Sequence, residues 1–177
     1  MLFQHTYEDI RVNQEAKKLV ESIPGIEEIL DTLKEYTYGI YKKGKKSIVL
    51  APDDVVKYQT GTCIDVHIYI ARELLKLKYE TKLLYLGNFK DLKNSVLHLT
   101  PIFKYQDKWY NLERTWSKYK KLHGPFESKE EVIDFVKNNF KKEYKEYTEE
   151  NLISHIDKLI KMLPKEIDTF VSKLSKI

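Results

Sequence analysis

The residues best suited to chemistry are a cysteine, a histidine and a glutamate that lie far apart in the sequence. Cys63 is the single cysteine of the 177-residue chain, and a thiolate is a strong nucleophile. Acyl transfer by a cysteine also needs a proton acceptor and a group that orients the acceptor. His98 and Glu113 provide these two groups if the fold brings them to Cys63, so the sequence predicts a Cys63–His98–Glu113 triad.

The segment that contains Cys63 is predicted to begin a helix. Thr62 is a good N-cap, and Asp65, three residues later, is placed to bind the free amides of the first turn. Cys63 then occupies the first helical position, where unpaired amides and the positive end of the helix dipole favour a thiolate. Gly61 leaves room for a substrate carbonyl to approach.

The oxyanion formed in acyl transfer needs hydrogen-bond donors near the nucleophile. The backbone amide of Cys63 and the side chain of Gln59 are the candidate donors. Gln59 equally fits a structural role at the end of the preceding helix, and a free cysteine on its own is often a small buried apolar residue.

His98 and Glu113 are predicted to lie on neighbouring strands. Val96 to Tyr105 and Lys108 to Thr115 are rich in branched and aromatic residues. If Gln106-Asp107 forms an even-numbered turn, His98 and Glu113 become diagonal neighbours on one face of the sheet. An odd-numbered loop would place Glu113 on the opposite face, so the triad depends on this turn.

The remaining pattern predicts an α+β architecture, in which the cysteine-bearing helix packs on an antiparallel sheet. Lys82 to Asn88 adds a third strand. Apolar residues at helical spacing indicate further helices in Asn13 to Tyr41, in Ser128 to Phe140 and on both sides of Pro164. We therefore expect one domain over residues 1–142, with a helical extension over residues 143–177 packed on it.

Several of these motifs resemble the transglutaminase-like superfamily over roughly residues 50–125. Gly61-Thr62-Cys63 at a helix start, His98 on a strand and Trp109 four residues before Glu113 are similar to its Gly-x-Cys, His and Trp-x-x-x-acid motifs. The resemblance implies a papain-like core and thiol acyl-transfer chemistry, with the three residues in the triad positions. The superfamily usually has aspartate where this chain has Glu113.

The resemblance implies a mechanism more than a substrate, because one fold serves many functions. The expected function is acyl transfer on a protein, peptide or other amide, by a cysteine peptidase, an amidase or deamidase, or a transglutaminase-type enzyme. The alternative is a catalytically inactive module that binds a protein partner. No cofactor is expected under either interpretation.

His67 follows Cys63 by one helical turn and is the other candidate ligand for a metal. Two ligands do not make a closed site, and the sequence has no Cys-x-x-Cys or His-x-x-x-His pair to complete one. We therefore expect no metal site, and we expect His67 to be a core histidine with its hydrogen bonds satisfied.

Charge and hydropathy indicate which kinds of partner and which cellular location to expect. Lysine and arginine total 31 and aspartate and glutamate 27, for a net charge of +4. This balance does not favour nucleic acid, so Lys42 to Lys46 and Trp116 to Lys121 are expected to be solvated surface. The sequence has no apolar run of the roughly 20 residues that a membrane span needs, and Met1 to Glu15 has no apolar signal region. A lone thiol suits a reducing compartment, so we expect a cytoplasmic protein; no pattern indicates an oligomeric state.

Overall fold

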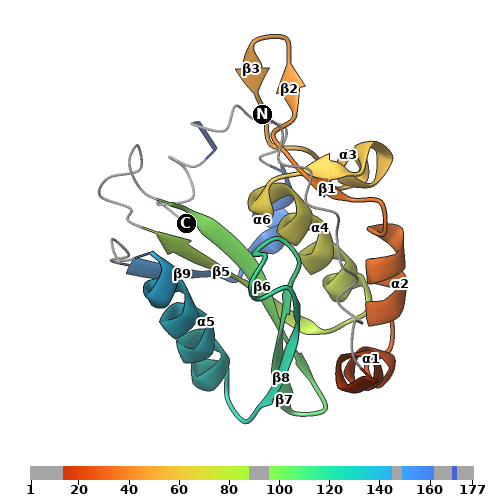
Figure 1. Cartoon of the computed structure of the whole chain (residues 1–177), viewed down its shortest axis with the longest axis vertical. Helices are drawn as coiled ribbons and strands as arrows, with labels where there is room; N and C mark the ends of the chain where they lie inside the picture. The colour runs from red at the N-terminus through yellow and green to blue at the C-terminus, as the bar shows by residue number, and fades with distance from the viewer. Residues whose placement is uncertain (1–13, 88–95, 145–148, 162–168, 171–177) are drawn as a thin grey trace.

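A five-stranded antiparallel sheet organises the fold, with helices on both of its faces (Figure 1). The computed structural model describes residues 14–87, 96–144, 149–161 and 169–170. The strands lie in the order β8-β7-β6-β5-β9. Their bounds are β5 (Glu80–Gly87), β6 (His98–Tyr105), β7 (Lys108–Glu113), β8 (Lys121–Phe126) and β9 (Glu149–Ile153). The predicted α+β class is confirmed.

The helices divide between the two faces of this sheet. The cysteine-bearing helix α4 (Cys63–Lys76) packs against β5 and β6, while α5 (Lys129–Glu143) packs on the opposite face. Four shorter helices lie on the α4 side: α1 (Gln14–Glu21), α2 (Ile26–Thr32), α3 (Pro52–Tyr58) and α6 (Ile156–Lys161). None of the described helices has the length and apolar content that a bilayer span requires.

Two small ladders lie beside the main sheet. The first is a parallel pair between β1 (Thr37–Tyr38) and β4 (Thr60–Gly61), which ends two residues before Cys63. The second is a hairpin of β2 (Lys42–Lys43) and β3 (Lys46–Ser47), which projects from the top of Figure 1.

Side chains of β5 alternate between the two faces of the sheet and pack against the helices on each face. Leu83 and Tyr85 pack with α4 and α6, whereas Leu84 and Leu86 pack with α5. Successive strand residues point to opposite faces, and both faces of β5 are covered, which explains its continuous apolar run.

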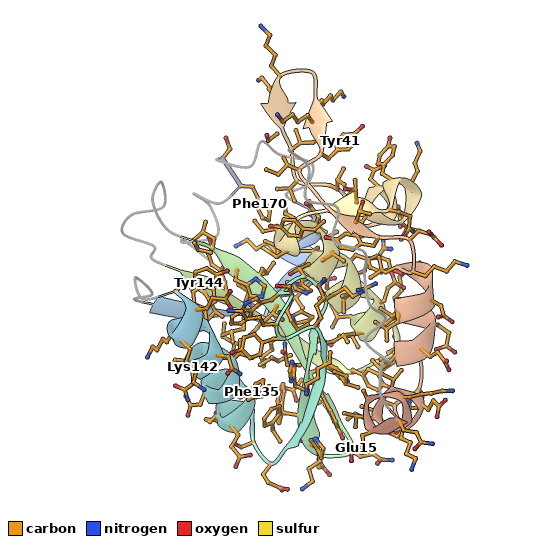
Figure 2. All side chains as sticks on the ribbon, viewed as in Figure 1. Glu15, Tyr41, Phe135, Lys142, Tyr144 and Phe170 are labelled. Carbon is orange, nitrogen blue, oxygen red and sulfur yellow. The ribbon has the colours of Figure 1, made fainter. Side chains whose placement is uncertain are left out.

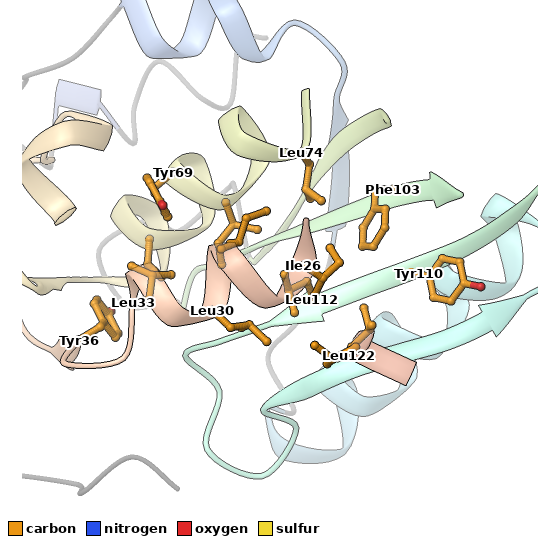
Figure 3. Close-up of a cluster of buried hydrophobic side chains, with 14 of the residues drawn as sticks. Ile26, Leu30, Leu33, Tyr36, Tyr69, Leu74, Phe103, Tyr110, Leu112 and Leu122 are labelled. Carbon is orange, nitrogen blue, oxygen red and sulfur yellow. The ribbon is translucent and has the colours of Figure 1, made fainter. Parts of the chain in front are cut away.

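A third cluster of buried side chains joins the N-terminal helices to the sheet (Figure 3). Ile26, Leu30 and Leu33, from α2 and the residue that follows it, meet Leu112 and Phe103 of the strands. Full burial of such a side chain is worth roughly 1.5–3 kcal/mol, so the N-terminal helices are part of the same core as the sheet.

The turn between β6 and β7 has the even length on which the predicted register depends. Tyr105 pairs with Lys108, and Ile102 pairs with Asn111. Gln106 and Asp107 form the loop with φ of 47° and 60°. Positive φ at both positions is the requirement of a type I′ turn, whose twist matches that of the flanking strands. The turn at Gln106-Asp107 therefore has the even length that the predicted triad required, and that length is two residues.

The sequence pattern misses two of the five strands. β8 is hidden because its lysine-rich start and its Gly-Pro pair obscure the alternation. Leu152 and Ile153, which the pattern assigns to a helix, lie on β9 and pair with Leu84 and Leu83. The open edge of β5 offers a row of backbone hydrogen bonds, and this tertiary pairing overrides local helical spacing. The extension after residue 142 is therefore not helical throughout, while the domain boundary itself stays a prediction.

The second predicted C-terminal helix lies mostly outside the described residues, as does the end of the predicted strand at Asn88. Phe170, one of the residues assigned to that helix, is buried against the cluster formed by α4 and α6.

The turn yields a prediction about stability. Replacing Gln106→Asn together with Asp107→Gly should raise the free energy of unfolding by about 1 kcal/mol, because these residues adopt left-handed conformations at lower cost. The lost Lys104–Asp107 ion pair is exposed and contributes little. Urea unfolding measures the change. A lower midpoint in the double variant would contradict the assigned turn.

Candidate functional site

Cys63 is fixed at the first position of α4 by a network around Asp65. The Asp65 carboxylate accepts hydrogen bonds from the Thr62 amide at 2.6 Å and the Thr62 hydroxyl at 2.8 Å. Its other oxygen accepts from the Leu50 amide at 2.6 Å. Burial raises the pKa of Asp65 against the effect of these bonds. The predicted contact between Asp65 and the helix cap is confirmed, and it ties the cysteine to two segments of chain.

Gly61 is required by packing immediately before this cap. Its φ is 156°, and a Cβ at this position would lie 2.7 Å from the Asp65 Cβ. The Gly61 carbonyl accepts hydrogen bonds from the Tyr36 hydroxyl and the Gly39 amide, at 2.7 and 2.8 Å. The close approach that glycine permits here is therefore that of Asp65, in addition to any approach by substrate.

The structure brings His98 and Glu113 into direct contact. His98 is the first residue of β6 and Glu113 is the last residue of β7. His98 Nε2 lies 2.8 Å from Glu113 Oε2, and both residues are buried. The diagonal placement predicted from the turn therefore results in a hydrogen-bonded pair.

Glu113 binds the following loop with its second oxygen. Oε1 accepts hydrogen bonds from the Thr115 amide at 2.8 Å, the Thr115 hydroxyl at 3.1 Å and the Trp116 amide at 2.9 Å. Burial by itself raises the pKa of Glu113. The charge of His98 and the hydrogen bonds outweigh burial and hold that pKa well below its usual range. Glu113 is therefore an ionised carboxylate at neutral pH.

The Cys63 side chain is the other group that acts on the His98 ring, and the two residues line one cavity. Burial works to lower the pKa of His98, but the charge of Glu113 and the hydrogen bonds to Cys63 and Glu113 raise it to about 10. Because Nε2 is bound to Glu113, Nδ1 is the ring nitrogen left for the sulfur. The Cys63 thiol also contacts the Leu97 carbonyl at 3.8 Å. An imidazolium beside a sulfur stabilises the thiolate electrostatically.

Aromatic rings hold the His98 imidazole in this orientation. The centroid of Trp116 lies 5.5 Å from that of His98, and Phe140 stacks on it at 6.2 Å with an interplanar angle of 23°. Trp116 is itself fixed, because its Nε1 donates to Glu143 at 2.6 Å. Trp116 and Trp109 both pack in the buried cluster that contains α5 residues, and of the two only Trp116 lines the cavity beside Cys63.

Cys63 and His98 share a cavity of about 200 Å³. Residues from five parts of the chain line it: Tyr38, Cys63, Val96, Leu97, His98, Thr115, Trp116, Ser117, Glu143 and Tyr144. Tyr144 follows the C-terminal end of α5, as Figure 2 shows. The cavity gives the thiol access to a small group, and Tyr38, Trp116 and Tyr144 contribute aromatic side chains to its wall.

His67 connects the three elements that carry the triad. Its Nδ1 binds the Leu99 carbonyl, and its Nε2 accepts a hydrogen bond from the Arg114 amide at 3.1 Å. Leu99 and Arg114 directly follow His98 and Glu113 in the sequence. A carbonyl partner requires a proton on Nδ1 and an amide partner requires a lone pair on Nε2, so the ring is neutral. Burial lowers its pKa to about 4. The predicted core histidine with satisfied hydrogen bonds is confirmed.

His67, His98 and Glu113 also form a group with the spacing of metal ligands. Their candidate ligand atoms lie within 4.8 Å of one another, a cluster that the sequence does not reveal because it arises from three separate elements. The lone pairs are already engaged, since His67 Nε2 accepts from Arg114 and both Glu113 oxygens accept hydrogen bonds. The arrangement fits a closed hydrogen-bond network better than a metal centre.

Gln59 does not join this group. It is the C-cap of α3 with a left-handed φ of 48°, and its side-chain amide donates to the carbonyls of Thr32 at 2.9 Å and Val56 at 2.8 Å. Both amide protons are therefore used, and Gln59 does not line the cavity. This placement matches the alternative role at the end of the helix and leaves the Cys63 amide as the candidate oxyanion donor.

Comparisons with known proteins assign no family to the chain. No protein-family model matches the sequence, and the search of curated proteins returns no match either.

The opposite pKa shifts of the two histidines predict a pH optimum of stability. His67 titrates at about 4 when folded and near 6.5 when unfolded, so the protein loses stability as the pH falls between these values. His98 titrates at about 10 when folded, so its contribution is complete below about pH 6.5 and is lost as the pH rises toward 10. A plot of unfolding free energy against pH should therefore fall on its acidic side because of His67 and on its basic side because of His98, with its maximum between them.

Single variants separate the loss of stability at low pH from the loss at high pH. His67→Asn retains a donor for Leu99 but does not titrate, so it should flatten the fall toward pH 4. His98→Gln should flatten the fall toward pH 10. Guanidinium unfolding at several pH values measures both slopes. Unchanged slopes in the variants would show that other groups set the pH dependence.

The reach of the Glu113 side chain is also testable. Glu113→Asp removes one methylene, so the shorter carboxylate loses either His98 or the amides of the following loop. The loss should cost about 1–3 kcal/mol and lower the pKa of His98. Chemical unfolding and NMR titration of the imidazole give the two readouts. Glu73→Asp, at a partly exposed carboxylate that pairs with Arg72 and does not line the cavity, is the matched control.

Proposed function

We propose that this chain is a thiol-dependent acyl-transfer enzyme. The observation that carries the proposal is that His98, hydrogen-bonded to the buried Glu113 carboxylate, lines the same cavity as Cys63. Nucleophile, base and orienting group in this order are the parts that covalent acyl chemistry requires. The resemblance to the transglutaminase-like superfamily and its papain-like core supports the same conclusion.

The chemistry follows from the positions of the three side chains. The Cys63 sulfur attacks the carbonyl carbon of an amide, and the carbonyl oxygen becomes an oxyanion that faces the Cys63 amide at the start of α4. As the C–N bond breaks, His98 gives its proton to the leaving amine, which leaves a thioester. Water or a second amine then attacks the thioester, His98 accepts the proton of the attacking group, and the thiolate is released.

Glu113 acts through His98 in this sequence. Its carboxylate fixes the ring so that Nδ1 faces the sulfur, and it stabilises the positive charge that the ring carries. The substrate is a protein, peptide or other amide whose acyl group enters a cavity of about 200 Å³ that Tyr38, Trp116 and Tyr144 help to line. Hydrolysis and transfer differ only in the second nucleophile.

Alkylation of Cys63 tests this proposal. Iodoacetamide should modify wild-type protein almost as fast at about pH 6 as at about pH 8, because the His98 pKa of about 10 keeps an imidazolium beside the sulfur at both values. His98→Gln should slow the reaction at the lower pH by about tenfold or more. Cys63 is the single cysteine, so intact mass measures its modification directly.

His123→Gln is the matched control. His123 is also buried, but its ring binds the Tyr119 carbonyl at 2.7 Å and does not line the cavity. This variant should react at the wild-type rate. If His98→Gln reacts like His123→Gln, the imidazole does not activate the sulfur. A folded protein whose Cys63 stays unreactive would favour the inactive binding module instead.

A further inference from the structure

Two walls of the cavity continue directly into lysine-rich surface. Tyr38 lines the cavity, and the chain then runs from β1 into the β2–β3 hairpin, whose sequence is Lys42-Lys43-Gly44-Lys45-Lys46. Ser117 lines another wall, and Lys118 follows it. The triad chemistry uses neither basic segment.

Three lysines of the hairpin, Lys42, Lys43 and Lys45, have no counter-charge among the described residues. Lys42, Lys43 and Lys45 are exposed, and none of them forms an ion pair within the part of the chain that the structure describes. Lys118 is 68% exposed and has one long contact, 3.5 Å from its Nζ to Glu143 Oε1. The hairpin projects away from the helices in Figure 1, so a ligand has access to it.

The hairpin is also held in a fixed relation to Cys63. The Thr37 and Gly39 amides each donate a 2.8 Å hydrogen bond, to the carbonyls of Gln59 and Gly61 respectively. At the base of the hairpin, Tyr41 stacks on Tyr58 of α3 with centroids 4.9 Å apart. Figure 2 shows Tyr41 at this base. The segment that leads into the hairpin is therefore hydrogen-bonded to residues that shortly precede Cys63.

We propose that the hairpin, with Lys118, is a docking surface that selects polypeptide substrates with acidic residues near the reacting amide. This inference rests on the proposed function, since it assigns a substrate class to the same site. Clustered exposed lysines, here chiefly Lys42, Lys43 and Lys45, attract carboxylates and raise the encounter rate of an acidic partner. A polypeptide presents both parts at once, an acyl group for Cys63 and carboxylates for the lysines.

The distance between the cavity and the hairpin sets the spacing between the reacting acyl group and the acidic residues of a substrate. Lys42 lies four residues beyond Tyr38, which corresponds to at most roughly 13 Å of extended chain. A bound peptide in extended conformation covers that distance in about four residues. Acidic residues three to six positions from the reacting residue are therefore in reach of the hairpin.

The hairpin fits a polypeptide better than a nucleic acid. Binding to single-stranded nucleic acid combines positive charge with aromatic rings on which bases stack. The ring next to the lysines, Tyr41, is already stacked on Tyr58. The cavity beside the hairpin contains an acyl-transfer site, and a nucleic acid presents no amide carbonyl on a flexible side chain to enter it.

Peptides that carry a chloroacetamide on one side chain test the proposal. The Cys63 thiolate forms a bond to the methylene carbon as chloride leaves, so labelling needs no knowledge of the natural substrate. Three peptides of equal length are compared: an acidic one with Asp and Glu, a neutral one with Asn and Gln, and a basic one with Lys. In each peptide these residues lie three to six positions from the reactive group, on both sides of it. The rate of each, divided by the rate of free chloroacetamide, measures docking alone.

The acidic peptide should label Cys63 about tenfold faster than the neutral one at low salt, and the advantage should disappear at about 0.5 M salt. The combined Lys42→Glu, Lys43→Glu and Lys45→Glu variant should abolish the advantage. The matched control reverses Lys17, Lys18 and Lys129, which lie on α1 and at the start of α5, toward the opposite end of the molecule (Figure 1). This control has the same net charge and should keep the advantage.

The outcomes separate the two proposals. If free chloroacetamide does not react with Cys63 in folded protein, the proposed function fails. If it reacts but the acidic peptide shows no advantage, or keeps the advantage in the hairpin variant, the docking surface is overturned. A competition experiment tests nucleic acid as the ligand. A single-stranded oligonucleotide and an unreactive acidic peptide of equal charge are each added during labelling by the acidic peptide. If the oligonucleotide slows labelling of Cys63 more strongly, the docking surface for polypeptides is overturned in favour of nucleic acid.

Discussion

The buried Glu113 carboxylate is the constraint on which the rest of the site depends. A carboxylate taken out of water is costly unless charge and hydrogen bonds compensate it. Here the compensation comes from the His98 ring on β6 and from the Thr115 and Trp116 amides after β7. The donors come from two parts of the chain, β6 and the loop directly after Glu113, so the charge is fully compensated only when β6 is assembled beside β7. The interactions that orient the proposed base are therefore also interactions that stabilise the fold.

Two buried histidines in one network have opposite protonation states, and their partners explain the difference. The His98 ring is hydrogen-bonded to a carboxylate and shares a cavity with the Cys63 thiol, so positive charge is stabilised there and its pKa rises to about 10. The His67 ring lies between a carbonyl and a backbone amide that needs a lone pair, and its pKa falls to about 4. Environments that separate the pKa values of neighbouring groups in this way assign distinct roles to them. The positive charge is thus confined to the ring beside Cys63.

The sequence predicts the parts of this site that depend on local rules. The Thr62 cap with Asp65 sets the start of α4, and the polar pair Gln106-Asp107 permits the even turn that places His98 and Glu113 on one face. The rest arises from tertiary pairing. β9 forms because β5 has an open edge, and Gln59 turns away from the cavity because the carbonyls of α2 and α3 accept its amide protons. No local pattern contains these partners.

The role of His67 shows how one helix coordinates all three members of the site. Cys63 and His67 are one turn apart on α4, hence on the same face. His67 is bound to the residues that follow His98 and Glu113, so a shift of α4 that moved the sulfur away from the imidazole would break both bonds of His67. The broken bonds would leave a buried ring and a buried amide without partners, which is costly. The separation between nucleophile and base is therefore held by a residue that takes no part in the proposed chemistry.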